Sequence, residues 1–355
     1  MITLILVIIV ISLLILVHEW GHFYSARKFG VKVEEFGFGF PPKIFSRVKN
    51  GIRYSFNLLP FGGFVKIFGE HGEGEGNIES FASRPAWQRF IILSAGVLMN
   101  FILAWVFFSI GSVLGVPHVA DEKAGVMPVS IIGVESGSPA DKAGLRFGDQ
   151  LLQLRSLDLE LRVESENDVR DFVDAYRGEE VTLMIKRGEE IKEILATPRV
   201  EFPEGEGPLG IALARLTLSP VPWYWAPFEG ALMVFRSTVA TVSGLWGIVG
   251  DFIFEGRTKA AVSGPIGIFF FANDIRTLGL AYFVQFVGIL SVNLAILNFL
   301  PIPALDGGRV FFLALEKIRR KRIDPKVENM VHTIGFVLLI LLMVAVTYGD
   351  VVKIL

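Results

Sequence analysis

The stretch LVHEWGHFY, residues 16–24, constrains this chain most, because it places three ionisable side chains at the end of an apolar segment. From Ile2 to Val17 the only polar residues are Thr3 and Ser12. A bilayer-spanning helix takes about 20 apolar residues. Ionisable groups cost at least ~2.5 kcal/mol each at the centre of such a helix, so they are retained there for pairing or function. The stretch therefore predicts a functional site inside a membrane.

Composition extends the membrane prediction to the whole chain. Hydrophobic residues make up 52% of the 355 residues. The mean hydropathy is +0.53, which is typical of a multi-span membrane protein with a soluble part. The net charge is only −2, so no nucleic-acid partner is indicated. The chain has no cysteine, so a metal site would have to use His, Asp or Glu.

Hydropathy predicts a polytopic α-helical membrane protein with about four transmembrane helices. The expected parts are spans at 1–25, 88–114, 278–300 and 330–348, a loop at 26–87, a soluble domain at 115–210, a membrane-surface region at 211–277 and a linker at 301–329. The apolar residues of 226–254 recur at helical spacing, but Arg236 interrupts them. We interpret this segment as an amphipathic helix lying on the membrane, with a fifth span as the alternative.

The distribution of charge predicts the orientation of the chain. The 316–328 linker carries six lysines and arginines, and 25–89 holds more basic than acidic residues. Cytoplasmic loops are enriched in Lys and Arg, so both should be cytoplasmic. The 115–225 segment is strongly acidic. Four spans with both termini and the acidic domain outside satisfy all three observations.

The 26–87 loop carries a hairpin signal. Asn50-Gly51 lies between two extended stretches, and Asn-Gly favours a type I′ turn because both positions need positive φ. After the turn Tyr54 and Phe56 fall on the apolar face of an alternating strand, Ile52–Leu58. We expect a cytoplasmic, membrane-associated β-hairpin.

The HEWGH motif at 18–22 matches the pattern H-E-x-x-H. Positions i and i+4 share one face of a helix, so His18 and His22 can hold one metal ion. Glu19 then lies close enough to take a proton from metal-bound water. The motif predicts a zinc centre with a general base.

Two histidines leave a zinc ion short of ligands, because catalytic zinc has three protein ligands and an open position for water. The best third donor is Asp306, which follows Pro301 and Pro303 in NFLPIPALDGGRVFF. The alternative is a solvated Asp that caps the following helix. His18 lies about 24 Å along the first span at 1.5 Å per residue, toward the cytoplasmic face. Asp306 follows the inner end of the third span, so the topology favours a His, His, Asp site.

Three motifs together resemble the bacterial site-2 proteases, which are intramembrane zinc metalloproteases of peptidase family M50. They are HEWGH in the first span, the segment SPADKAGLRFGDQLLQL, which resembles PDZ domains, and NxxPxPxLDG at 298–307. The resemblance implies one extracytoplasmic α+β PDZ domain with its core at 126–200, as in the single-PDZ branch. It carries over His18, His22 and Asp306 as metal ligands and Glu19 as catalytic acid/base.

The resemblance also implies an activity and a location. The protein would be a multi-pass endopeptidase of a bacterial cytoplasmic membrane, acting in regulated intramembrane proteolysis with its active site toward the cytoplasm. It would cleave single-span proteins, such as anti-sigma factors or remnant signal peptides, that another protease has already trimmed. The alternative is a catalytically inactive membrane adaptor, against which the intact HEWGH and LDG motifs argue.

A substrate helix must open before cleavage, and strand addition could satisfy its bare backbone groups. The Ile52–Leu58 strand, with Tyr54 and Phe56, is the candidate edge, and a plain hairpin is the alternative. Asn298 could hold the substrate backbone or the oxyanion. Asn293 and Asn100 are weaker candidates, because asparagines also join helices by hydrogen bonds.

The PDZ domain has two possible roles. It could bind a peptide C-terminus, or it could act as a size filter for substrates whose outer domain has been removed. We favour the filter, because the acidic domain is expected outside, across the membrane from the inferred zinc.

Overall fold

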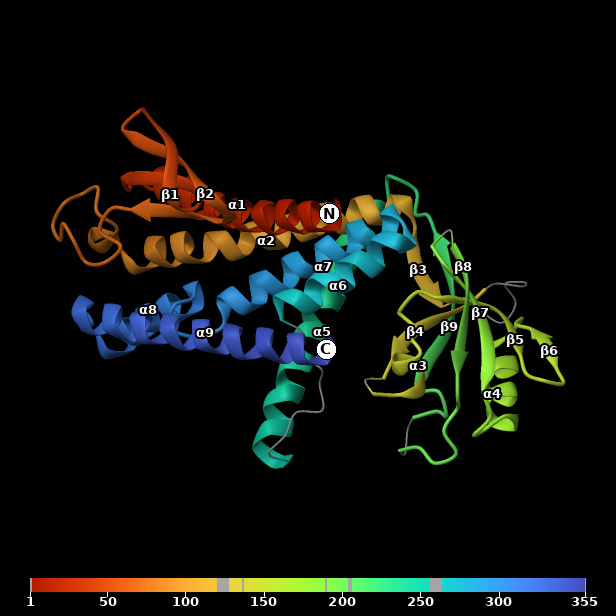
Figure 1. The fold of residues 1–355 in the computed structure, drawn as a ribbon. Helices are drawn as coiled ribbons and strands as arrows, with labels where there is room; N and C mark the ends of the chain where they lie inside the picture. The colour runs from red at the N-terminus through yellow and green to blue at the C-terminus, as the bar shows by residue number, and fades with distance from the viewer. Residues whose placement is uncertain are drawn as a thin grey trace. The chain divides into compact units, whose positions relative to one another are not determined.

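The computed structural model describes residues 2–119, 128–135, 137–188, 190–203, 206–255 and 264–354. The chain divides into two compact units (Figure 1). The first, which we call the helical unit, consists of Met1–Ser109, Pro227–Phe269 and Val287–Leu355. The second, the sheet unit, consists of Ile110–Ala226 and Phe270–Phe286. Most of the apolar segments therefore lie in the first unit and the acidic segment in the second.

Long apolar helices dominate the chain. They are α1 (Ile2–Lys28), α2 (Ala86–Leu114), α5 (Ala226–Glu255), α7 (Leu280–Phe299) and α9 (Pro325–Ile354). The described chain also has the shorter helices α6 (Pro265–Leu278) and α8 (Asp306–Arg319) and a 3₁₀ turn at Phe81–Ser83. In the described residues five helices are long and apolar enough to cross a membrane. The chain is a membrane protein.

The sequence predicts four spans, whereas the structure has five candidates. The additional candidate is Ala226–Asp251, because α5 continues unbroken for 30 residues through Arg236. Its direction differs from that of its neighbours, since α5 runs across the common direction of α1, α2 and α9 in the helical unit (Figure 1). The large apolar side chains of one stripe along α5 are exposed, from Phe235 to Trp246 and Ile253.

The hairpin forms where Asn-Gly predicts it. Strands β1 (Val33–Lys49) and β2 (Ile52–Ile67) are joined through Asn50 and Gly51, whose φ angles are 52° and 78°. Their inner residues share a core with the end of α1, with α2 and with α8. The core residues are Phe23, Ala26, Val31, Val33, Ile52, Ile67, Phe81, Ile92, Leu93 and Leu313.

The β2 strand folds back on β1, which changes the expected strand edge. Phe36 pairs with both Tyr54 and Val65, and Tyr54 also pairs with Arg47. The segment around Tyr54 and Phe56 therefore has a partner strand on each side. The expectation that Ile52–Leu58 offers a free edge is wrong, because the hairpin's own strands fill both sides. In the described part of the chain, the Gly63–Ile67 segment pairs on one side only.

The sheet unit is built around one antiparallel sheet in the order β3-β9-β4-β5-β7-β8, with β6 beside β5. The strands are β3 (Val116–Val119), β4 (Val129–Val134), β5 (Gln150–Arg155), β6 (Glu160–Arg162), β7 (Val181–Arg187), β8 (Glu190–Ala196) and β9 (Ile211–Ser219). Helices α3 (Pro139–Lys142) and α4 (Glu166–Ala175) cover a core that includes Ile131, Leu154, Phe172 and Leu183.

The sheet unit extends beyond its predicted end. Strand β9 pairs with both β4 and β3, so 211–219 belongs to the sheet and not to the membrane-surface region predicted at 211–277. Hydropathy does not indicate this boundary, because the strand joins the sheet to pair its backbone N–H and C=O groups. Buried Asp149 accepts two 2.7 Å hydrogen bonds from the Arg187 guanidinium and thereby ties the β5 start to β7.

Candidate metal centre

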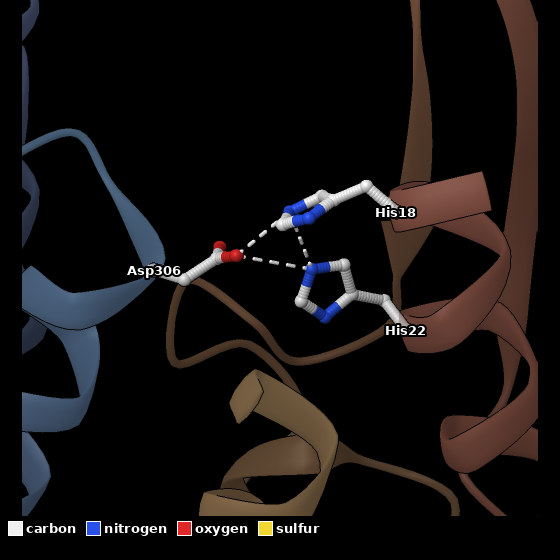
Figure 2. Close-up of side chains that lie close together, drawn as sticks. All are labelled: His18, His22 and Asp306. Atoms are coloured by element: carbon white, nitrogen blue, oxygen red, sulfur yellow. Dashed lines mark hydrogen bonds and ion pairs between the residues drawn. The ribbon is translucent and has the colours of Figure 1, made fainter. Parts of the chain in front are cut away.

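Three side chains from two distant segments of the sequence converge in the helical unit (Figure 2). His18 and His22 project from one face of α1, as their i, i+4 spacing predicts. Asp306, the first residue of α8, meets them. Its Oδ2 lies 2.9 Å from His18 Nε2 and 3.2 Å from His22 Nε2, and the two Nε2 atoms lie 3.2 Å apart.

These distances fit one zinc ion. A tetrahedral zinc with bonds of about 2.0–2.1 Å holds its ligand atoms about 3.3 Å apart. The side chains are sheltered, with 7% of His18, 8% of His22 and 23% of Asp306 exposed. Together the three residues could hold a metal ion, and the remaining exposure of Asp306 leaves an open side for a fourth ligand.

The α2 helix supports both imidazoles. His22 Nδ1 donates to the Ile92 carbonyl at 2.8 Å, which leaves its Nε2 lone pair free for a metal. The Asn100 side chain lies 3.3 Å from His18 Nδ1. Between them Gly96 allows the close approach, because a Cβ there would lie 2.3 Å from His22 Nε2. The residues 92, 96 and 100 recur every four positions and form one face of α2.

The loop before Asp306 is tightly constrained. Ala304 adopts a positive φ of 79°, and its N–H donates to His332 Nδ1 on α9 at 2.9 Å. A Cβ on Gly307 would lie 2.2 Å from the Leu300 carbonyl oxygen, so the loop packs backbone against backbone. The N-cap of α8 is Leu305, without a side-chain cap. Asp306 therefore does not cap the helix and instead faces the histidines.

The charge state of Asp306 suits a metal ligand. Burial alone would raise the pKa of its carboxyl group. In the metal-free protein the neighbouring His22 and the hydrogen bonds at the Nε2 atoms of both imidazoles, whose place a metal ion would take, outweigh burial and hold that pKa well below its usual range. The carboxylate is therefore ionised and available as a donor.

Glu19 lines a cavity of about 280 Å³, and His18, Asp306 and Asn298 line the same cavity. Its Oε2 accepts a 3.0 Å hydrogen bond from the Val65 N–H. The outer side of the β2 segment at Gly63–Val65 thus holds the glutamate beside the three candidate ligands. One carboxylate oxygen is fixed and the other is left for a proton.

The other predicted site residues separate into groups. Asn298 lines the cavity. Asn293 instead accepts a 2.7 Å hydrogen bond from Thr241 of α5, which matches the helix-joining alternative. Tyr54 and Phe56 line a separate hollow on the hairpin, away from this cavity.

Several residues of the centre carry no obvious sequence signal. The Ile92 carbonyl and the Val65 N–H are backbone groups, which every residue possesses. Phe40, the last residue of the stretch GFGF at 37–40, lines the cavity. His332 lies close in sequence to Gly335, at which an added Cβ would lie 2.4 Å from Pro303 Cβ, so this part of α9 packs tightly against the loop before Asp306. A histidine near the start of an apolar span is the one sequence signal that could have indicated His332.

Comparison with known proteins places this centre in a family. A model of Peptidase family M50 matches residues 6–342. The chain belongs to peptidase family M50. It is 34% identical over 342 residues to CPE1693 of Clostridium perfringens, covering 96% of each chain. It is 29% identical to the zinc metalloprotease RasP of Geobacillus kaustophilus, covering 98% of this chain and 97% of RasP. It is 30% identical to RasP of Shouchella clausii, covering 99% of each.

The family and the geometry agree on the chemistry. The protein is a zinc metalloprotease, and the His18, His22 and Asp306 cluster could bind the metal. A protease acts on protein substrates. The alignment with RasP of G. kaustophilus extends over 431 positions, more than the 355 residues of this chain, so that relative contains inserted segments.

Proposed function

We propose that this metalloprotease is an endopeptidase that cleaves transmembrane segments of single-span proteins within the membrane, as in regulated intramembrane proteolysis. The observation that carries the proposal is the convergence of Asp306 on two histidines within an apolar helix of membrane-spanning length. Ionisable groups at such a depth are expensive unless they are paired or functional.

Each residue of the centre has a distinct task. His18, His22 and Asp306 hold the zinc, which when bound supplies Lewis acidity to the scissile carbonyl and to a water molecule. Glu19 takes the water proton on its carboxylate and returns it to the leaving amine. The Val65 N–H orients Glu19 by fixing Oε2. The Asn298 amide, in the same cavity, holds the substrate backbone or the developing oxyanion.

The substrate would add as an extended segment beside Gly63. This residue lines the cavity with Glu19, and its strand has a partner on one side only in the described chain. Strand addition would satisfy the backbone groups that a locally opened substrate helix exposes. We therefore propose the Gly63 segment as the docking edge instead of the Tyr54 segment, which already has a partner strand on each side.

The direction of α1 and α7 supports four crossings. Asp306 follows α7 and meets His18, so α1 and α7 enter from the same side. The chain between α2 and α7 must then cross the membrane an even number of times. Because α6 has 14 residues, about 21 Å at 1.5 Å each, it is too short for a crossing. We therefore infer that α5 lies on the membrane. The charge distribution supports a topology in which both termini and the sheet unit lie outside and the active site faces the cytoplasm of a bacterial inner membrane.

The sheet unit would be a single PDZ domain. A groove of about 510 Å³ lies between α4 and the 206–213 segment and could receive a peptide C-terminus. The size-filter role makes a different prediction: deletion of the sheet unit would allow cleavage of substrates that keep their outer domain. Loss of cleavage of a trimmed substrate would instead favour peptide recruitment.

The test is cleavage of a single-span protein by the purified protein in liposomes. Cleavage should require zinc and should be lost in Glu19→Gln, which keeps the size of the side chain but not its basicity. Zinc content and thermal unfolding should match the wild type. Unchanged cleavage by Glu19→Gln would contradict the mechanism. Absence of cleavage by the wild type under all zinc-loaded conditions, with partner binding through the sheet unit, would favour the adaptor alternative.

A further inference from the structure

Asn100 has a position in the structure that neither helix joining nor substrate binding explains. Its side chain is completely buried, at 0% exposure, and it does not line the cavity at Glu19. We propose that Asn100 is a positioning residue that sets the tautomer of His18, so that His18 Nε2 is free to hold the metal. The inference rests on the proposed function, because it concerns the same metal centre.

The geometry places the Asn100 amide against the outer nitrogen of His18. The amide lies 3.3 Å from His18 Nδ1, while Nε2 of the same ring faces Asp306 and His22. A neutral imidazole carries one hydrogen, and the nitrogen that carries it cannot bind a metal. Because Nε2 is the ligand atom, Nδ1 must carry the hydrogen. That hydrogen is buried and needs an acceptor.

Among the residues that the structure describes, Asn100 is the one side-chain partner of His18 Nδ1. Its oxygen accepts and its nitrogen donates, and a half-turn of the amide exchanges the two with almost no change of shape. With Nδ2 toward His18, the amide would donate to Nδ1 and so favour the tautomer whose hydrogen is on Nε2, which cannot bind a metal. With Oδ1 toward His18, the amide accepts the Nδ1 hydrogen and favours the metal-binding tautomer. Metal binding therefore selects the second orientation.

His22 has the equivalent arrangement without a side chain. Its Nδ1 donates to the Ile92 carbonyl, which can only accept. One face of α2 thus supplies an acceptor for each histidine, four residues to either side of Gly96. Acceptors in this position fix the ring and raise the basicity of the ligand nitrogen. Only the Asn100 acceptor can be removed by substitution.

Helix joining is carried by a different atom of the same residue. The Asn100 backbone carbonyl accepts a 2.8 Å hydrogen bond from Ser291 Oγ of α7. That contact remains whatever the side chain is. Ser291→Ala is therefore a matched control, because it removes the helix-joining hydrogen bond and leaves the amide beside His18.

The experiment measures zinc affinity of the full chain in detergent, by competition with a chromogenic chelator. Asn100→Leu, similar in size but without an acceptor, should bind zinc about 10- to 100-fold more weakly. Asn100→Asp, whose carboxylate only accepts, should bind zinc about as tightly as the wild type. Ser291→Ala should leave zinc affinity unchanged.

Three results would overturn the proposal. Wild-type zinc affinity in Asn100→Leu, with a raised KM, would make Asn100 a substrate residue. Equal weakening in folded Asn100→Asp and Asn100→Leu would make its role packing alone. If Asn100→Leu fails to fold, the His18 Nδ1 proton in zinc-loaded Asn100→Asp still decides, because a stronger acceptor should move its NMR signal downfield. An unmoved signal would count against the inference. Failure of the wild type to bind zinc would instead contradict the proposed function.

Discussion

The missing side chain of Gly96 allows α1 and α2 to approach closely at the metal centre. A Cβ on Gly96 would lie 2.3 Å from His22 Nε2 and 2.7 Å from His18 Cε1, which real side chains do not tolerate. Gly96→Ala must displace both imidazoles from their positions beside Asp306. We expect zinc affinity to fall at least about tenfold, as for other losses of ligand support, and stability to fall by about 1–3 kcal/mol from overpacking. Chelator competition and thermal unfolding measure the two effects.

Gly244→Ala is the control for this substitution. Gly244 also lies within a helix, but a Cβ there would meet nothing within 4 Å. Alanine is the better helix former by roughly 0.5–1 kcal/mol, so this variant should be slightly more stable with unchanged zinc affinity. Equal losses in both variants would mean that glycine flexibility, and not the space beside the histidines, matters at position 96.

A second prediction at this scale concerns the loop that carries Asp306. His332→Leu removes the acceptor of the partly buried Ala304 N–H, and a fully buried donor left without a partner would cost about 1–3 kcal/mol, which is an upper bound here. Ala304 also has a left-handed backbone, at φ 79°, which costs about 1–2 kcal/mol for a residue with a Cβ. We expect His332→Leu to lower zinc affinity. Ala304→Gly in that background should recover part of the loss of stability. No recovery would mean that His332 does not act by holding the left-handed backbone of Ala304.

At the scale of elements, the β2 strand is a support for Glu19 as well as part of a hairpin. Proline is tolerated where an N–H points away from the sheet partner. Val65→Pro therefore removes the 3.0 Å hydrogen bond to Glu19 Oε2 and keeps the strand. We expect kcat to fall by about tenfold or more, since general base catalysis contributes 10²- to 10⁴-fold, with unchanged zinc content. Val65→Ala keeps the N–H and should keep kcat. A similar loss in both variants would assign the effect to the side chain.

The elements also show where sequence reasoning succeeds. HEWGH and LDG predict the cluster of His18, His22 and Asp306, which could hold a metal ion, because the chemistry lies in side chains at helical or loop positions with a characteristic spacing. The Asn50-Gly51 turn is predicted because few residues accept positive φ twice. The pairing of Tyr54 on both sides is not predicted, since alternation indicates a strand but not its neighbours. The supports from Ile92, Val65 and Ala304 are backbone groups brought near by packing, and the sequence does not indicate them.

For the whole molecule, the decisive question is on which side α5 ends. Under the proposed topology, the contact between His18 and Asp306 implies an even number of crossings between α2 and α7, and the short α6 would leave none for α5. The chain has no cysteine, so single cysteines report their location without background. Phe254→Cys, at an 87% exposed position near the end of α5, should react with a membrane-impermeant maleimide added to intact spheroplasts. Leu157→Cys in the sheet unit should react likewise, and Arg320→Cys in the basic linker should react only after permeabilisation. Protection of Phe254→Cys until permeabilisation would mean that α5 crosses the membrane, and α6 would then have to cross as well to bring Asp306 back to the histidines.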